Sequence, residues 1–569
     1  MASLLGPPEL HKTAPKPSQS QPQQPSADRF IDLMVADFNK TTVAAMPPMG
    51  FTENGSPTFL SSGNPCLDFF FHVVPNTPPH ALTQRLQAAW AQNPLTTLKL
   101  ICNLRGVRGT GKSDKEGFYT AALWLHSLHP KTLACNVASF AEFGYFKDLP
   151  EIIYRLLEGL DVRKIQKAEW MQRKRSRRRI KNAEERNKIK KEKASKLRKE
   201  KRFVMAKKVV ERYSHDPDFR FLYDRVSDHF AECLKNDMKF YEAGKFRKVS
   251  LAAKWCPSNR LRKQVLVPLR KVLELPEVYI GANRWDSIPY NRVASVAMKF
   301  YKEKFLKHDK ERFSKYLEEV KSGKAKIAAG ALLPHEIIAS LDDLDGGQVA
   351  ELQWKRMVDD LLKKGKLRNC LAVSDVSGSM TGIPMEVSVA LGVLVSELSE
   401  EPWKGKMITF SENPELQMVE GDDLKSKTEF VRNMNWGANT DFQKVFDLIL
   451  KVAVNGNLKP EQMIKRLFVF SDMEFDQAGI NPWETDYQVI VRKYTEKGYG
   501  SVVPDIVFWN LRDSRATPVP GTQKGVALVS GFSKNLLTLF FDNDGAIDPE
   551  LTMEAAISGE EYQKLVVVD

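Results

Sequence analysis

An aspartate and two serines follow a short apolar run with the spacing D-x-S-x-S. Asp375, Ser377 and Ser379 come directly after Leu371–Ser374, a stretch typical of a buried strand. Carboxylate and hydroxyl oxygens, with no Cys or His among them, suit a hard cation such as Mg²⁺ rather than zinc. The spacing therefore predicts a loop that binds Mg²⁺ or another divalent cation at the end of a strand.

Two later segments supply the same kinds of side chain. Gly437–Asp441 contains Thr440, and the apolar run Leu467–Phe470 leads through a serine to Asp472. The carboxyl ends of parallel strands share one edge of a sheet, and open α/β sheets bind ligands in the crevice at that edge. We therefore expect the segments to converge on one metal site. The expected metal-binding residues are Asp375, Ser377, Ser379, Thr440 and Asp472.

The elements that would position this site begin after Asn369. Strand-like runs alternate there with helical patterns, which favours an α/β, doubly wound (Rossmann-like) domain with a mostly parallel sheet over 369–569. The expected strands are Leu371–Ser374, Met407–Phe410, Leu467–Phe470, Ile506–Trp509 and Val526–Val529. The expected helices are Met385–Ser399, Phe442–Val454, Tyr487–Lys497 and Lys534–Phe541.

The chain before this domain differs in composition and in the spacing of its apolar residues. Residues 1–27 are rich in Pro, Gln and Ser, which predicts a disordered tail. Residues 28–345 show apolar residues at helical spacing between short connections, which predicts an all-α region of HEAT-like helical repeats. The Asp- and Gly-rich segment at 341–347 marks a boundary, and a helix within 346–368 would bridge the two domains.

The positive charge of the chain is concentrated in one helical insertion, 164–208. The net charge is +14 in total, but Arg163–Lys208 holds 22 Lys/Arg and 5 Glu, which leaves −3 for all other residues. Nucleic-acid contact through phosphates, a nuclear import signal and a simply solvated helix all remain open for this segment. The residues expected to contact nucleic acid there are Arg173, Lys174, Arg175, Arg177, Arg178 and Arg179.

A glycine-rich segment formally matches a nucleotide-binding pattern. Gly106–Ser113 satisfies G-x4-G-K-S, and Leu98–Leu104 before it could pass as a strand. The surroundings, however, favour helices and supply no acidic strand end for Mg²⁺. A flexible loop between helices is the preferred interpretation, and Arg105, Arg108 and Lys112 would then contact nucleic-acid phosphate.

The composition of the 569 residues indicates which class of protein the chain belongs to. Apolar residues make up 42% and charged residues 27%, as in ordinary globular proteins, and no apolar run approaches the length of a membrane span. Six scattered cysteines without a C-x-x-C pair are typical of a reducing compartment, so we expect a cytoplasmic or nuclear protein. No Ser/His/Asp or Cys/His set indicates catalysis, so we expect no enzyme, no small-molecule substrate and no membrane partner.

The order D-x-S-x-S, G-x-N-T-D, strand-terminal Asp resembles a von Willebrand factor A (vWA) domain with its metal-ion-dependent adhesion site. The resemblance implies that Ser377 and Ser379 ligate the metal directly, that Thr440 does so directly or through water, and that Asp375 and Asp472 hold ligating waters. A carboxylate from a partner would take the remaining position.

A helical region followed by a vWA domain resembles the Ro autoantigen and other proteins with the TROVE module. It is similar, more closely, to an uncharacterised family of plant and large-DNA-virus proteins. The matching segments are 105–112, 144–149, 331–338, 375–380 and 530–535. The resemblance implies a non-enzymatic, RNA-binding ribonucleoprotein scaffold that docks an acidic protein partner at the metal site. A protein-interaction module without an RNA role and a P-loop nucleotide-using enzyme are the alternatives.

Overall fold

The computed structural model describes residues 46–177, 184–257, 260–410, 414–434, 441–476, 484–542 and 545–569. The side chains of 173–195 and of residue 409 are also outside the description. The chain divides into two compact units, Met1–Met46 and Pro47–Asp569, and everything below concerns the second. The tail expected over 1–27 lies outside the described residues.

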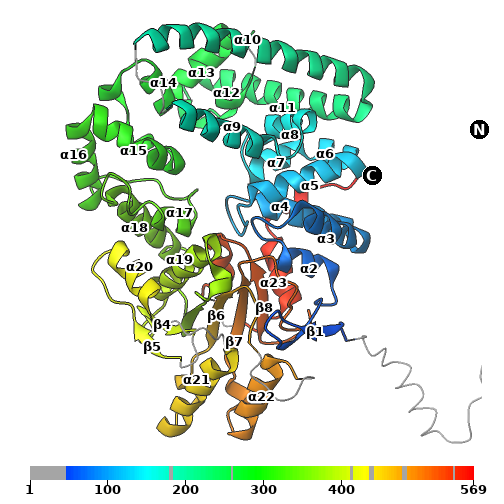
Figure 1. The fold of residues 1–569 in the computed structure, drawn as a ribbon, viewed down its shortest axis with the longest axis vertical. Coiled ribbons are helices and arrows are strands. Elements are labelled where there is room, and N and C mark those ends of the chain that lie inside the picture. Colours follow the sequence, from blue (N-terminus) through cyan, green and yellow to red (C-terminus); the bar gives the residue numbers. More distant parts are fainter. Residues whose placement is uncertain are drawn as a thin grey trace, which may run out of the picture. The chain divides into compact units, whose positions relative to one another are not determined.

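The N-terminal part of this unit is helical, as predicted (Figure 1). Prolines and side-chain caps set where its helices begin. Pro94 is the first residue of α4, for example, and the Asn93 side chain before it accepts a hydrogen bond from the Thr96 N–H. The helices are α2 (Pro65–His72), α3 (Pro79–Gln92), α4 (Pro94–Arg105), α5 (Lys115–Leu128), α6 (Pro130–Cys135), α7 (Val137–Phe143), α8 (Asp148–Glu158), α9 (Val162–Arg177), α10 (Glu184–His215), α11 (Pro217–Glu242), α12 (Ala252–Trp255), α13 (Val267–Val272), α14 (Pro276–Gly281), α15 (Ser295–His308), α16 (Lys310–Lys321), α17 (Pro334–Ile338) and α18 (Gln348–Leu362).

The C-terminal part is built on a mixed, mostly parallel sheet, which confirms the predicted α/β character. The strand order is β5-β4-β3-β6-β7-β8, and every pairing is parallel except β4 with β5. The strands are β3 (Cys370–Ser374), β4 (Lys406–Thr409), β5 (Leu416–Met418), β6 (Arg466–Ser471), β7 (Asp505–Asn510) and β8 (Val526–Ser530). The helices are α19 (Ile383–Leu398), α20 (Leu424–Asn433), α21 (Phe442–Gly456), α22 (Asp486–Glu496) and α23 (Pro549–Ala556).

Buried strands explain why this sheet forms. Every residue of β3 and β6 is buried, as parallel strands covered on both faces require. Helix α19 packs against β3, β4 and β6, whereas α2 and α23 pack against β8. One continuous hydrophobic core extends from α2 through the sheet, and a second cluster lies around α15 and α16.

The helical region and the sheet domain contact each other near both chain ends of the unit. A hairpin that the sequence did not reveal, β1 (Met49–Phe51) with β2 (Pro57–Phe59), bonds to the sheet domain through the Phe59 N–H and the Thr517 carbonyl at 3.0 Å. At the other end, the Asp569 carboxylate accepts hydrogen bonds from the Lys131 and Thr132 main-chain N–H groups at 2.9 Å. The helical region and the sheet domain therefore stabilise each other.

The predicted basic helix is described in part. Helix α9 ends at Arg177 and α10 begins at Glu184, and residues 178–183 between them lie outside the description. Within the described residues, none of the helices has the length and apolar character that crossing a lipid bilayer requires.

Candidate metal centre and nucleic-acid interface

The predicted metal residues that the structure describes meet at one edge of the sheet. Strands β3 and β6 are parallel neighbours, with Ser374 paired to Phe470. Asp375 is the first residue after β3, and its main-chain N–H donates to the Phe470 carbonyl at 3.0 Å. Asp472 follows β6 directly, and both aspartates are 1% exposed. Adjacent strand ends thus place two buried carboxylates side by side.

Hydroxyl groups complete this oxygen-rich cluster. The Asp375 carboxylate accepts a hydrogen bond from the Ser377 N–H at 2.9 Å and another from the Ser471 hydroxyl at 2.7 Å. The hydroxyl oxygens of Ser377 and Ser379 lie 3.0 Å apart, and Ser379 is exposed to solvent. The D-x-S-x-S loop therefore holds its two serines together above the strand ends.

The electrostatics of the edge favour a cation. Burial and the neighbouring Asp472 carboxylate together raise the pKa of Asp375 to about 6, against the opposing hydrogen bonds from Ser377 and Ser471. Two repelling carboxylates and two hydroxyls are the oxygen donors that Mg²⁺ accepts, together with water. Among the described residues no three His, Cys, Asp or Glu side chains are arranged to hold a metal, so a cation at this edge would depend on the serines and on water.

One predicted ligand cannot be placed. Thr440 lies outside the described residues, as does the rest of 435–440. The next residue, Asp441, caps α21 by accepting a hydrogen bond from the Lys444 N–H at 3.2 Å. The role of Thr440 as a ligand stays a prediction.

Sequence reasoning missed a basic side chain at the same edge. One terminal nitrogen of Arg512, which follows β7, lies 3.5 Å from the Asp472 carboxylate and 3.4 Å from the Ser379 carbonyl oxygen. The signal was available, because β7 is parallel to β6 and Arg512 therefore follows a strand end on the same edge. Arg512 partly neutralises Asp472 and would compete with a metal ion for it.

The glycine-rich loop does not form a P-loop. Helix α4, rather than a strand, precedes it, and Lys112 is 1% exposed. The Lys112 ammonium donates to the carbonyls of Phe70 and Val73 and to the Ser530 hydroxyl, so it joins α2 to β8. Gly111 is required for this packing because a Cβ there would lie 2.2 Å from the Gly106 carbonyl oxygen. The nucleotide-using enzyme built on this loop loses its structural basis.

Two of the three basic residues predicted in this loop are therefore corrected. Lys112 is buried, and burial lowers its pKa to about 7. Arg105 is 3% exposed, and its Nε donates to the buried Asp148 carboxylate at 2.8 Å. Neither side chain can reach a phosphate on the surface, because each is buried and hydrogen-bonded to other buried groups. Arg108 alone of the three is exposed.

The predicted nucleic-acid residues of the basic helix are not placed by the structure. The side chains of Arg173, Lys174, Arg175 and Arg177, and the whole of Arg178 and Arg179, lie outside the description. Their contact with nucleic acid stays a prediction. What the structure does describe is the surface at the start of α9, which leads into this segment.

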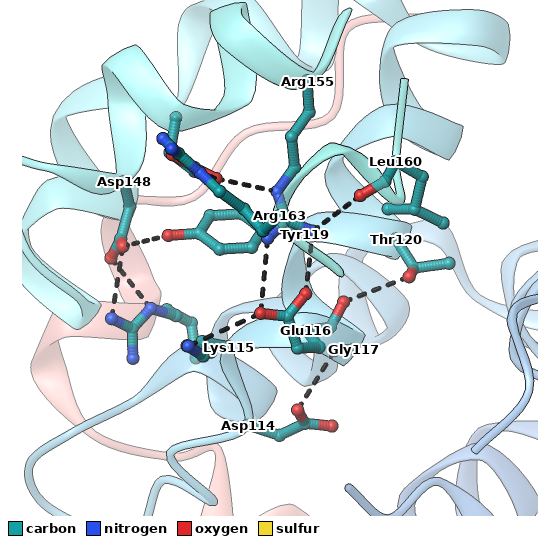
Figure 2. A network of polar contacts seen from close by, with 12 residues as sticks. Asp114, Lys115, Glu116, Gly117, Tyr119, Thr120, Asp148, Arg155, Leu160 and Arg163 are labelled. Carbon is teal, nitrogen blue, oxygen red and sulfur yellow. Dashed lines mark hydrogen bonds and ion pairs between the residues drawn. The ribbon is translucent and has the colours of Figure 1, made fainter. Parts of the chain in front are cut away.

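A basic cavity of about 580 Å³ lies beside the start of α9. Figure 2 shows the polar network that forms one side of it. The Arg155 guanidinium, 2% exposed, donates to Glu151 at 3.0 Å and to Glu116 at 2.8 Å. Arg163, the second residue of α9, also donates to Glu151 and lies over the Tyr154 ring at 4.6 Å. The basic and aromatic residues that line the cavity are Lys115, Lys147, Arg155, Arg163, Tyr119, Tyr154 and Trp255.

The two arginines are neutralised by glutamates, but Lys147 is not. Its ammonium lies 4.9 Å from the Tyr145 ring centre and 5.6 Å from that of Trp255. Lys147 has no carboxylate within ion-pair distance in the part of the chain that the structure describes. Its pKa is lowered by desolvation and by nearby cations, although Asp148 opposes this. Trp255 is 36% exposed and offers a ring face beside the charge.

Comparisons with known proteins cover nearly all of the described chain. Residues 52–260 and 258–367 match the model of a domain of unknown function, DUF2828, and residues 369–566 match that of another, DUF7788. The vWA assignment of the second region thus stays a prediction. "Uncharacterized protein L728" of Acanthamoeba polyphaga mimivirus is 28% identical over 535 residues, which cover 86% of this chain and 84% of that protein.

A solved structure is also similar over most of its length. The crystal structure of the Deinococcus radiodurans RO (RSR) protein aligns with 88% of this chain and 99% of its own, at 11% identity and a TM-score of 0.35.

Proposed function

Because the chain belongs to the DUF2828 family, whose description assigns no activity, we propose its function from its own surfaces: it is a non-enzymatic RNA-binding scaffold. The observation that carries the proposal is the cavity beside α9, where cations and aromatic rings line one space. It lies at the start of the helix that leads into the segment whose net charge of +17 accounts for the chain's net excess of positive charge.

The chemistry of this cavity suits a single-stranded nucleotide segment. Bases of any identity stack on exposed aromatic rings, and the phosphates between them bind cations. Trp255 supplies the exposed ring, Lys147 supplies charge next to it, and Lys115, paired with Glu116 at 3.6 Å, lines the same cavity. The same surface explains affinity better than sequence specificity, because stacking on a ring and contact with a phosphate accept any base.

Replacing Trp255 with alanine is expected to weaken binding of a single-stranded RNA by about 5- to 150-fold, because a stacked base contributes about 1–3 kcal/mol. Replacing Lys147 with glutamine is expected to weaken binding and to reduce the slope of log affinity against log salt by about 0.7. Fluorescence anisotropy of a labelled oligoribonucleotide, titrated with full-length protein at several salt concentrations, measures both.

Matched controls separate this surface from a general loss of charge or apolar area. Phe246, 47% exposed, and the exposed Lys245 lie outside the cavity, and Phe246→Ala and Lys245→Gln should leave the affinity within twofold. Equal losses in Trp255→Ala and Phe246→Ala, or an unchanged affinity in Trp255→Ala and Lys147→Gln, would show that RNA does not use the cavity.

A metal-dependent protein-interaction site at the sheet edge is the second candidate function. The close pair of buried carboxylates and the serine hydroxyls 3.0 Å apart favour it. Asp375, Ser377, Ser379 and Asp472, with Thr440 if it completes the set, would hold Mg²⁺. Bound there, the metal would offer an open position to a carboxylate of an acidic partner.

Mg²⁺ is expected to raise the melting temperature, because a ligand that binds the folded state stabilises it by mass action. At ten times the dissociation constant the gain is about 1.4 kcal/mol. The Ser377→Ala protein should lose this shift, whereas Ser558→Ala, a change at an exposed serine elsewhere, should keep it. Differential scanning fluorimetry with Mg²⁺, and with Na⁺ at equal ionic strength, makes the comparison. No Mg²⁺ shift in the unaltered protein would contradict the site.

A further inference from the structure

A second cavity, of about 640 Å³, lies where the helical region meets the sheet domain. The glycine-rich loop contributes Arg108 and Gly109 to it, and the segment before α17 contributes Gly330 and Ala331. The wall is completed by Tyr145, by the last turn of α18 with the two lysines after it, and by the start of the short 3-10 helix Lys534–Phe540, which follows β8. None of the residues lining this cavity lines the one beside α9.

Four hydrogen-bond donors in this cavity have capacity left to bind a ligand. Lys534, 7% exposed, donates to the carbonyls of Gly330 at 3.1 Å and Leu332 at 2.8 Å, which leaves one ammonium N–H. Arg108 donates through one terminal nitrogen to the Glu142 carbonyl at 2.7 Å. Within the described ranges, the other N–H groups of Arg108 have no hydrogen-bond partner. The same holds for the Lys364 ammonium and the Tyr145 hydroxyl.

The charges around the cavity are unbalanced. Arg108, Lys363, Lys364 and Lys534 line it, and Asp360 is the single carboxylate among the lining residues. Asp360 is already engaged, at 2.9 Å from Arg356 and 3.6 Å from Lys363. Burial and the nearby Lys364 together lower the pKa of Lys534 to about 8, although Glu336 and Asp360 oppose the shift. An anion between these groups would relieve their repulsion.

A simpler explanation accounts for part of this cluster. Lysines at the end of a helix offset the partial negative charge of its last carbonyls, and Lys363 and Lys364 follow the end of α18 directly. That effect does not require a buried lysine on another element, nor Arg108 and Tyr145 from the helical region. The four donors come from four separate segments and share one cavity, which is the arrangement of a ligand site.

The remaining wall is apolar and defines the other half of the ligand. Val107, Ala331, Met357 and Leu361 line it beside the cationic groups. The volume falls within the range of about 300–1,000 Å³ that small-molecule sites occupy. We propose that this cavity binds a nucleoside phosphate, with the phosphate between Arg108, Lys364 and Lys534 and the base against the apolar wall. The phosphate can belong to a free nucleotide or to the 5′ end of an RNA.

Isothermal titration calorimetry of full-length protein with AMP tests the proposal, with adenosine as the ligand that lacks phosphate. AMP is expected to bind and adenosine to bind at least tenfold more weakly. Arg108→Gln and Lys364→Gln should each weaken AMP binding by about 10- to 100-fold, because each removes a charge-assisted hydrogen bond. Both side chains are exposed, so these changes leave the fold intact.

The matched control is Lys366→Gln, which removes the same charge from an exposed lysine two residues beyond Lys364 and outside the cavity. Its AMP affinity should stay within twofold. An oligoribonucleotide with a 5′-phosphate, compared with its 5′-hydroxyl form, tests the RNA end as the source of the phosphate.

Binding of either phosphorylated ligand that depends on Arg108 and Lys364 supports the site. The proposal is overturned if neither ligand binds at millimolar concentration, if adenosine binds as well as AMP, or if Lys366→Gln weakens binding equally. It does not rest on the RNA scaffold: loss of RNA affinity on changing Trp255 leaves AMP binding at this cavity unchanged.

Discussion

Replacing Asp148 with alanine is expected to lower the free energy of unfolding by about 3–5 kcal/mol, because it leaves a buried guanidinium without its carboxylate. Asp148 is fully buried and accepts hydrogen bonds from Arg105 Nε at 2.8 Å and from the Tyr119 hydroxyl at 2.6 Å. It also accepts one from the Tyr145 N–H at 2.9 Å. Urea unfolding followed by circular dichroism measures the loss.

An exposed ion pair provides the control. The Asp161 side chain is 58% exposed and lies 3.2 Å from Lys164, so Asp161→Ala should change stability by less than about 1 kcal/mol. The double change Arg105→Met with Asp148→Ala should lose less than the sum of the single losses, since it removes the unpaired charge. A loss in Asp148→Ala no greater than that in Asp161→Ala would mean that the buried pair contributes nothing to the fold.

Acid is expected to destabilise the protein through His72. Its side chain is 3% exposed, and burial, with Arg85 and Lys112 nearby, lowers its pKa to about 3. In the unfolded chain the imidazole takes up a proton below about pH 6.5. Between these two pKa values the unfolded state binds more protons, so stability falls as the pH falls, by about 2 kcal/mol at pH 5.

The urea midpoint at pH 7 and at pH 5 measures this effect. His72→Gln should have a smaller difference between the two midpoints than the unaltered protein, even if it is less stable at both. His80→Gln, a change at an exposed histidine, should retain the full difference. An unaltered pH dependence in His72→Gln would assign acid sensitivity to other groups, such as His335, whose pKa burial lowers to about 4.

The sheet edge shows how far local sequence can predict a site. The apolar runs before Asp375 and Asp472 predicted two strands, and parallel neighbours necessarily end at the same edge. The structure places both carboxylates and the two serines there. Arg512 was missed because no motif surrounds it. Its place after the predicted strand Ile506–Trp509 was the available signal, but its contact with Asp472 also depends on β7 lying next to β6.

The glycine-rich loop shows where local pattern misleads. A short apolar run such as Leu98–Leu104 fits a strand and a buried helix equally well. The capping residue Asn93 and the proline after it were the available evidence for a helix, and α4 begins there. The fate of Lys112 could not be predicted, because its carbonyl partners lie on α2 and its hydroxyl partner on β8, far away in the sequence.

The two cavities could not be predicted from the sequence for the same reason. Lys147 and Trp255 are separated by more than a hundred residues, and so are Arg108 and Lys364. Each is an ordinary surface residue in its own segment. Tertiary packing gives them a shared environment, and no helical or strand period records which segments will meet.

The salt dependence of RNA affinity tests the proposed scaffold most directly. For the full-length protein and a single-stranded RNA, log affinity is expected to fall linearly with log salt. Glutamine at the six basic positions nearest the end of α9 should reduce the slope by up to about 4. Each phosphate contact that is lost lowers the number of counterions released on binding and contributes about 0.7 to the slope. Those positions are Arg173, Lys174, Arg175, Arg177, Arg178 and Arg179. An affinity that does not change with salt, or a slope identical in the two proteins, would contradict the account.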